Sequence, residues 1–120
     1  MANVTRVSPL YSAHVNVLSN PSATGNTAVV AAQPNGRIRV LSCAVVSTLA
    51  NNVKFQSAST DITATFPFGA NGGFILPFNE HGWFETAMNE ALNVNLSVAT
   101  ATGVQIQYII LSSAQAGAGI

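Results

Sequence analysis

The residues that could carry out chemistry gather in one stretch, residues 79 to 97, which reads NEHGWFETAMNEALNVNLS. It contains three of the four carboxylates in the chain, one of the two histidines and the only tryptophan: Glu80, Glu85, Glu90, His81 and Trp83. Carboxylates and imidazoles serve as general acids and bases and as metal ligands. The stretch could therefore be an active site, a metal site or a loop that leads into a strand.

A protein metal site needs three or four ligands. The chain offers seven candidates, which are four carboxylates, two histidines and one cysteine. Glu80, His81 and Glu85 form a loose cluster, but the sequence has no HExxH motif and no paired cysteines. Asp61 and His14 are distant in sequence and could join the cluster only through the fold. We expect neither a metal nor a cofactor.

Catalysis by a nucleophile needs a base and an orienting group beside it. The chain has no G-x-S-x-G elbow, and the sequence VLSCAVV places Cys43 on a buried strand, where a thiol behaves as a small apolar group. Glu85 and Glu90 could form the carboxylate pair of a glycosidase. That chemistry requires a deep cleft, and short loops on a small β-fold rarely build one. The glycines of NGG at 71–73 lack the GK[ST] context of a phosphate loop. We predict that the protein is not an enzyme.

Trp83 and Phe84, together with Phe78, could stack on a sugar ring, as aromatic side chains do in carbohydrate-binding sandwiches. Aromatic residues beside a glycine-rich loop more often close the end of a core. We therefore expect these three side chains to pack inward. The whole stretch is then a loop that anchors the next strand, with Glu85 and Glu90 solvated or paired with basic residues: Arg37, Arg39 or Lys54.

Composition narrows the classes of partner. The chain has 120 residues, enough for one domain with one core, and 48% of them are hydrophobic. Only 7% are charged, against roughly 25% in ordinary soluble proteins, and the net charge is zero. Four basic residues are too few to form a basic patch that would bind nucleic acid or an anionic membrane. No run approaches the ~18 apolar residues of a membrane span, and no signal peptide opens the chain, so synthesis in a cytoplasm is expected. A surface this neutral predicts self-association.

The elements that must position these residues are strands, because apolar and polar residues alternate along most of the chain. In 92–98 and 104–110 the apolar residues occupy one face, and runs in 36–46, 53–57 and 61–66 behave similarly. Turn signals separate these runs, at 20–21, 25–26, 34–36, 51–52, 71–73 and 102–103. The pattern predicts an all-β fold, an antiparallel β-sandwich of about eight short strands with a jelly-roll-like arrangement. We assign residues 21–113 to this domain and residues 114–120 to a C-terminal tail.

Two segments, 41–46 and 109–111, carry apolar side chains on both faces, although an antiparallel sheet normally exposes one face to water. Another copy could cover their outer faces, and so could loops or the N-terminal residues. The candidate interface residues are Leu41, Val45, Ile109, Leu111 and Tyr11. Residues 1–20 form either an arm that crosses to a neighbouring subunit or the first strand of the chain's own sheet.

Residues 36–111 resemble small structural proteins of tailed bacteriophages. The resemblance rests on six motifs in order: basic-Ile-Arg-Val-Leu at 37–41, V-x-F-x-S at 53–57, A-N-G-G at 70–73, W-F-E-T-A at 83–87, A-L-N-x-N-L-S at 91–97 and G-x-x-x-x-Y-x-x at 103–110. It implies a virion component without enzymatic activity. Within that group the chain is most similar to capsid decoration (cement) proteins, which implies a homotrimer bound to the major capsid protein on the outer capsid surface. The alternative is a receptor- or glycan-binding module of a fibre or tail.

Overall fold

The computed structural model describes residues 14–112, and the alternating sequence forms strands through most of this range, with no helix. The ten strands are β1 (Val15–Ser19), β2 (Gly25–Val30), β3 (Gly36–Ser47), β4 (Asn51–Ser57), β5 (Thr60–Asp61), β6 (Phe66–Phe68), β7 (Gly73–Leu76), β8 (Phe84–Glu85), β9 (Leu92–Leu96) and β10 (Thr102–Ser112). The predicted tail, Tyr11 and most of the proposed N-terminal arm lie outside the described residues. Within the described range no helix is long and apolar enough to cross a membrane.

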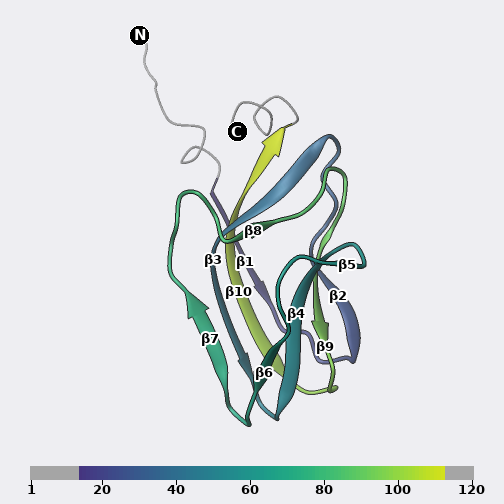
Figure 1. The fold of residues 1–120 in the computed structure, drawn as a ribbon, viewed down its shortest axis with the longest axis vertical. Coiled ribbons are helices and arrows are strands. Elements are labelled where there is room, and N and C mark those ends of the chain that lie inside the picture. The colour runs from purple at the N-terminus through teal and green to yellow at the C-terminus, as the bar shows by residue number, and fades with distance from the viewer. Residues whose placement is uncertain (1–13, 113–120) are drawn as a thin grey trace.

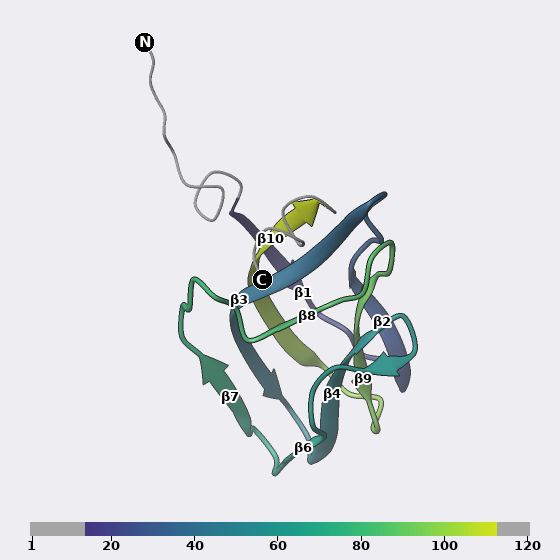
Figure 2. The same ribbon diagram turned by 45° about the horizontal axis from the view of Figure 1, so that its top comes forward.

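The strands form two five-stranded antiparallel sheets. Sheet A has the order β1-β10-β3-β7, with β8 also paired to β3. Sheet B has the order β2-β9-β4-β5, with β6 also paired to β4. Figures 1 and 2 show the strands of sheet A on one side of the molecule and those of sheet B on the other. The predicted all-β, antiparallel fold is confirmed, and the arrangement of the sheets is sandwich-like.

One core lies between the sheets, because alternate residues of the long strands point inward. Sheet A contributes Val40 and Ile106 and sheet B contributes Phe55 and Val94, each almost fully buried. The predicted inward face of 92–96 and the inward face of 104–110 are both confirmed by this core. Val98 lies beyond the end of β9 and is exposed, so the predicted strand ends two residues earlier than expected.

A β-bulge interrupts the pairing of β3 with β10. Tyr108 is opposite Val40 while Gln107 is opposite Ser42, so Leu41 is the extra residue. The bulge reverses which positions of β3 face inward: Val40 lies in the core before it, and Cys43 lies in the core after it. After the bulge the run is apolar on both faces, as expected, because Cys43 and Val45 point into the core while Ala44 and Val46 point away from it.

The four candidate interface residues within the described range are all buried. Val45 is buried in the main core, and Leu41, Ile109 and Leu111 form a second, smaller buried cluster. All four are inside the protein, so a surface for a partner must be sought among other residues.

The predicted strand at 61–66 is wrong in its interior, because the structure has two short strands there. β5 ends at Asp61 and β6 begins at Phe66, and both pair with β4. Between them the hydroxyl of Thr63 accepts a hydrogen bond from the backbone N–H of Phe55 at 3.0 Å, where a ladder carbonyl would otherwise serve. A polar side chain has replaced the backbone acceptor and broken the strand.

The turn signals succeed where asparagine adopts positive φ. Asn35 (φ 55°) and Asn71 (φ 60°) lie in the left-handed region, as the predicted turns at 34–36 and 71–73 require. The signals at 25–26, 51–52 and 102–103 are wrong, because these residues begin β2, β4 and β10. Their turns lie just before them.

Phe55 offers a direct test of the shared core. It is fully buried, and its ring lies 5.1 Å from that of Phe84 on the opposite sheet. We expect Phe55→Ala to lower the free energy of unfolding by about 3–5 kcal/mol, the usual cost of removing a buried phenylalanine. Chemical denaturation measures this value. The matched control is Phe78→Ala, because Phe78 is half-exposed and its loss should cost less than about 1 kcal/mol. Equal losses from the two variants would contradict the described core.

Candidate functional site

The stretch that is richest in chemical groups begins as a tight turn. The side chain of Asn79 accepts a hydrogen bond from the N–H of His81 at 2.9 Å, and its carbonyl accepts one from Gly82 at 2.9 Å. Gly82 has φ 82°, and a Cβ there would lie 2.5 Å from the side chain of Arg39. Glycine is thus required both by the backbone conformation and by the close approach of the turn to β3. The predicted loop is confirmed.

Glu85 is an ion-pair residue. It lies on β8 opposite Arg39, and its two carboxylate oxygens accept hydrogen bonds from Arg39 Nε at 2.8 Å and from Arg37 Nη1 at 3.0 Å. This outcome confirms the expected pairing of Glu85 with basic residues. Both carboxylate oxygens of Glu85 are thus engaged by arginine side chains of β3.

The remaining polar groups of the stretch bind the chain to itself. The Ser57 hydroxyl donates to Glu90 at 2.5 Å and accepts from the N–H of Ala87 at 2.9 Å. Buried Thr86 accepts a hydrogen bond from Ile38 at 3.0 Å. Asn89, with φ 64°, accepts one from Asn35 at 2.6 Å. These groups tie the connection before β9 to β3 and β4, and Glu85 and Glu90 bind different strands, Glu85 the arginines of β3 and Glu90 Ser57 of β4.

A further ion pair lies on sheet B. Lys54 Nζ is 3.1 Å from Asp61, and the Gln56 side chain donates to the same carboxylate at 2.6 Å. These hydrogen bonds from Gln56 and Lys54 lower the pKa of Asp61. The four carboxylates are therefore spread along the fold, and residues 14–112 contain no group of three or more His, Cys, Asp or Glu side chains that could hold a metal ion.

Two aromatic side chains of the stretch contradict the prediction. Trp83 is 44% exposed and Phe78 is 48% exposed, and only Phe84 packs against the core. The indole N–H of Trp83 donates to the carbonyl of Pro77 at 2.7 Å, which fixes the ring. The ring of His14 lies 5.7 Å from that of Phe78. We call His14, Phe78 and Trp83 the aromatic patch. The β7–β8 loop pairs its backbone with β3 through the Asn79 and Trp83 N–H groups, which holds these rings outward.

Sheet A exposes three apolar residues, of which only Val46 lies in a run that the sequence predicts to be apolar on both faces. Leu18 is 72% exposed, Val46 is 52% exposed and Ile75 is 75% exposed. Each stands next to a residue that packs in or against the core: Val17, Val45 and Phe74. Strict alternation was the available signal, since the residue between two inward-facing neighbours must face outward.

The thiol of Cys43 should show its burial through the pH dependence of stability. Burial raises the pKa of Cys43 from 9.0 to about 12, because the thiolate would lose its hydration. The unfolded thiol ionises above its ordinary pKa while the folded thiol remains protonated, so stability is lost as the pH rises from about 9 to 12. Between pH 8 and pH 10 we expect the wild type to lose about 1 kcal/mol more than Cys43→Ala does. Denaturation at the two pH values measures the difference, and parallel losses would contradict it.

The role of Glu85 is tested by removing its charge. Glu85→Gln should lower the free energy of unfolding by about 1 kcal/mol, because two partly exposed arginines lose their anion. His81→Ala, a change on the exposed side of the same turn, should stay within about 0.5 kcal/mol. The difference between the variants should shrink at high salt, since screening weakens the ion pairs. If Glu85→Gln left the free energy of unfolding unchanged, the ion pairs would not contribute to the stability of the fold.

Comparisons place no constraint on this site. The chain matches no protein-family model, no curated protein and no solved structure. Function must therefore be inferred from the residues themselves, and the two outward-facing features of the described fold are the aromatic patch and the apolar surface of sheet A.

Proposed function

We propose that the protein is a non-enzymatic structural component of a bacteriophage virion. In this proposal it is a capsid decoration (cement) protein that binds major capsid protein subunits on the outer surface of the head and bridges them. The order of sequence motifs in residues 36–111 is the first support. The second is the use of the ionisable groups, since Glu85, Glu90 and Asp61 serve the chain's own ion pairs and hydrogen bonds.

The observation that carries the proposal is the aromatic patch. Phe78 and Trp83 are half-exposed on a turn whose backbone is bonded to β3, and the Trp83 indole is fixed by its own hydrogen bond. Rigid aromatic side chains of this kind dominate binding energy at protein interfaces, because little conformational entropy is lost when they are covered. The patch is therefore assigned to the contact with the shell.

The connectivity of the strands is a third support, because it is compatible with the jelly-roll-like arrangement that we propose. If β5 and β6 are counted as one interrupted strand and β7 and β8 as another, the described chain has eight strands in two sheets of four. The first and last strands are then neighbours in sheet A, and the second and second-last are neighbours in sheet B. Jelly rolls of eight strands are common among viral capsid proteins and lectins.

Neutrality suits the same role. A net charge of zero lets many copies crowd on one shell without mutual repulsion. Contacts that are individually modest become strong when a symmetric assembly repeats them. We propose a homo-oligomer on this ground, and the resemblance favours a trimer.

The alternative is a glycan- or receptor-binding module on a fibre or tail, and the same exposed Trp83 supports it. An indole face can stack on a sugar ring. The two functions differ in their partner, so a single variant separates them.

Trp83→Ala is the test. Its effect on the free energy of unfolding should stay below about 1 kcal/mol, because the ring is half-exposed, while occupancy on expanded capsids should fall by at least about tenfold, as for an interface hot spot. Co-sedimentation with capsids that lack the protein measures occupancy. The matched control is Leu49→Ala, which removes an equally exposed apolar side chain beyond the other end of β3.

Unchanged capsid occupancy of Trp83→Ala would overturn the assignment of the patch. If that variant keeps its occupancy but loses binding to cell-surface glycans, the fibre or tail function replaces the decoration function.

A further inference from the structure

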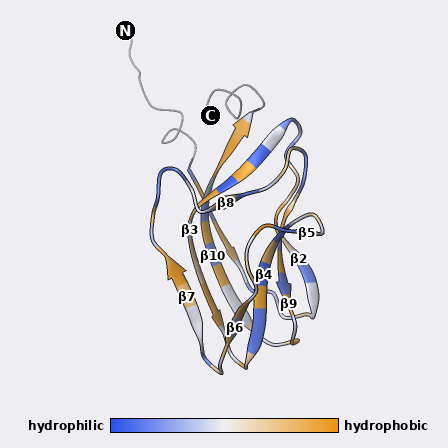
Figure 3. Ribbon diagram, in the orientation of Figure 1, coloured by the Kyte–Doolittle hydropathy of each residue, from blue (hydrophilic) through white to orange (hydrophobic). Residues whose placement is uncertain are grey.

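Part of the outward surface of sheet A carries no charge. It comprises the outward residues of β1, β7, residues 42–46 of β3 and residues 103–107 of β10, whereas Arg37, Arg39 and Glu85 lie on the same surface on the other side of the bulge. We call the uncharged part the pairing face, and its members are Asn16, Leu18, Ser42, Ala44, Val46, Ile75, Gly103, Gln105 and Gln107. Figure 3 shows β7, at one edge of this sheet, as largely hydrophobic.

Sheet B shows the contrasting pattern on its own outer surface. There Asn95 donates to Asn26 at 2.6 Å, and Lys54 and Gln56 both bind Asp61. These charged and amide groups form a surface suited to water. Within residues 14–112, sheet A carries its ion pairs at one end only, and its large exposed apolar side chains, Leu18, Val46 and Ile75, lie on the uncharged part of its outer surface.

The register of sheet A arranges the pairing face in rows. One row crosses all four strands as Leu18, Gln105, Ala44 and Ile75. In the neighbouring rows Gly103 of β10 is opposite Val46 of β3, and Gln107 is opposite Ser42. In every row one of the two central strands carries a large side chain and the other a small one.

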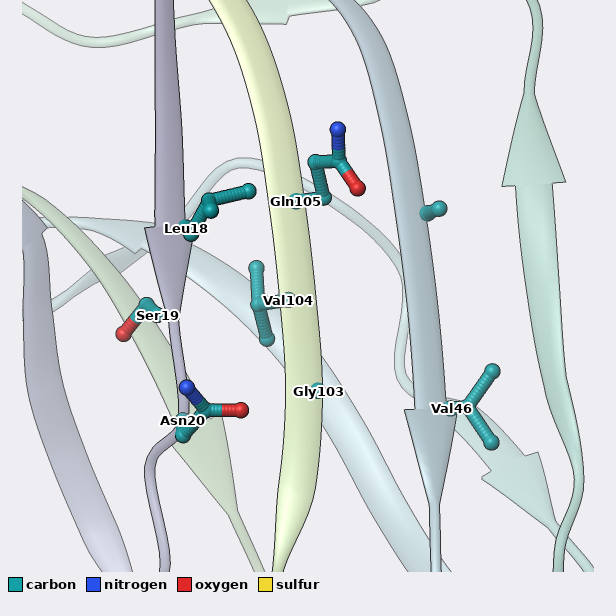
Figure 4. A pocket seen from close by; sticks show the side chains of 8 residues that line it. Leu18, Ser19, Asn20, Val46, Gly103, Val104 and Gln105 are labelled. Carbon is teal, nitrogen blue, oxygen red and sulfur yellow. The ribbon is translucent and has the colours of Figure 1, made fainter.

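The small residues leave hollows beside the large ones. A hollow of about 330 Å³ lies over Gly103, with Leu18 on one side and Val46 on the other (Figure 4). A second, of about 280 Å³, is bordered by Ser42, Ala44 and Ile75. Bumps and hollows thus occur on the same surface.

Gly103 has no evident role within a single copy. It lies inside β10, its φ is outside the left-handed region, and a Cβ there would meet no atom within 4 Å. Glycine weakens a strand, and in this setting it often marks a place where another chain approaches closely. The open space over Gly103 is on the pairing face, which indicates that the approaching chain belongs to a partner.

We propose that two copies of this chain pack through their pairing faces about a twofold axis that runs parallel to the strands, midway between β10 and β3. This axis places β10 over the partner's β3. Gly103 then receives the partner's Val46, Gln105 lies over the partner's Ala44, and Leu18 lies over the partner's Ile75. Each large side chain meets a small one, and each exposed apolar residue of the outer strands meets another.

A second copy fits this face better than an unrelated protein, because the matching pattern is built into the chain. A twofold contact needs one surface that is complementary to itself, and rows of large and small residues that exchange places across the axis meet this requirement. The nine residues of the pairing face carry no charge that pairing would dehydrate, and Arg39 and Glu85 lie on the other side of the bulge. Two sheets packed in this way lie about 10 Å apart, the spacing at which side chains of facing sheets interdigitate.

The area predicts how strong the pair is. Four strands about 4.8 Å apart span roughly 15 Å, so the central rows cover less than the roughly 800 Å² per partner of a typical stable interface. We expect a concentration-dependent pair in solution. If copies also form the trimer proposed above, the twofold contact joins trimers in pairs, so the number of copies is even in either case.

The first test uses charges placed at the two positions that the axis brings together. Leu18→Lys and Ile75→Glu should each halve the mass of the complex, because a charge then faces an apolar residue of the partner. An equimolar mixture of the two variants should restore the wild-type mass, since the introduced ammonium group meets the introduced carboxylate. The positions lie three strands apart in one sheet, roughly 14 Å, so no pair within one copy accounts for such a rescue. Sedimentation over a concentration series measures the mass.

The second test fills the hollow. Gly103→Val should leave the fold at least as stable as the wild type, because valine favours a strand and meets no atom, while the mass of the complex falls by half. Ala28→Val is the matched control, because Ala28 is exposed on β2 of sheet B. It should keep the wild-type mass.

Three results would overturn the proposal: a wild type with one copy or another odd number, a mixture that does not recover its mass, or an unchanged mass for Gly103→Val. Both tests use the free protein without capsids, so they are independent of the proposed function. If the protein did not bind capsids, the pairing proposal would be unaffected. If the copies did not pair, the proposed function would be unaffected.

Discussion

The structure depends above all on the antiparallel pairing of β3 with β10. This ladder runs from Thr102 opposite Ser47 to Ser112 opposite Gly36. Its inward side chains form much of sheet A's half of the core, and its outward ones form the centre of the pairing face. Both edges of sheet A are built on it, because β1 pairs with β10 while β7 and β8 pair with β3. The register of this one ladder therefore sets the core, the position of the Glu85 ion pairs and the rows of the outer surface.

The alternating pattern was enough to predict the class of fold, because a period of two residues, repeated along a chain with so many apolar residues, is typical of strands and not of helices. It was not enough to predict the bulge at Leu41. A run such as VLSCAVV is apolar throughout, and the same letters fit a strand that is buried on both faces or a strand that changes parity. Only the pairing with β10 distinguishes them, and that pairing joins residues about 60 positions apart in sequence. The aromatic patch was mispredicted for a related reason, since nothing local to Trp83 shows that β3 binds the backbone of its loop and leaves its ring outside.

The few charged side chains of the described strands are used in ion pairs. Glu85 lies between Arg37 and Arg39, and Lys54 pairs with Asp61, so these ion pairs join neighbouring strands within one copy. Each holds a short strand, β8 or β5, against a long one. A two-residue strand buries little apolar area, and an ion pair across the ladder adds cross-strand attraction at these weak points. These ion pairs therefore stabilise the fold within one copy.

The two outward-facing features are centred on different parts of β3 and adjoin each other, since Gln107 of the pairing face lies 3.2 Å from His14 of the aromatic patch. The aromatic patch lies beside the early part of the strand, where Trp83 binds the carbonyl of Val40, whereas the pairing face is centred near Ala44 on its outer surface. Apolar and amide contacts are short in range and are not screened by salt, so neither surface attracts a partner from a distance, and each depends on a close fit. A twofold pair would present two aromatic patches on one rigid body. A second patch that binds the same array raises the effective concentration of the first, so self-pairing and attachment to a repeated surface strengthen each other without a new contact.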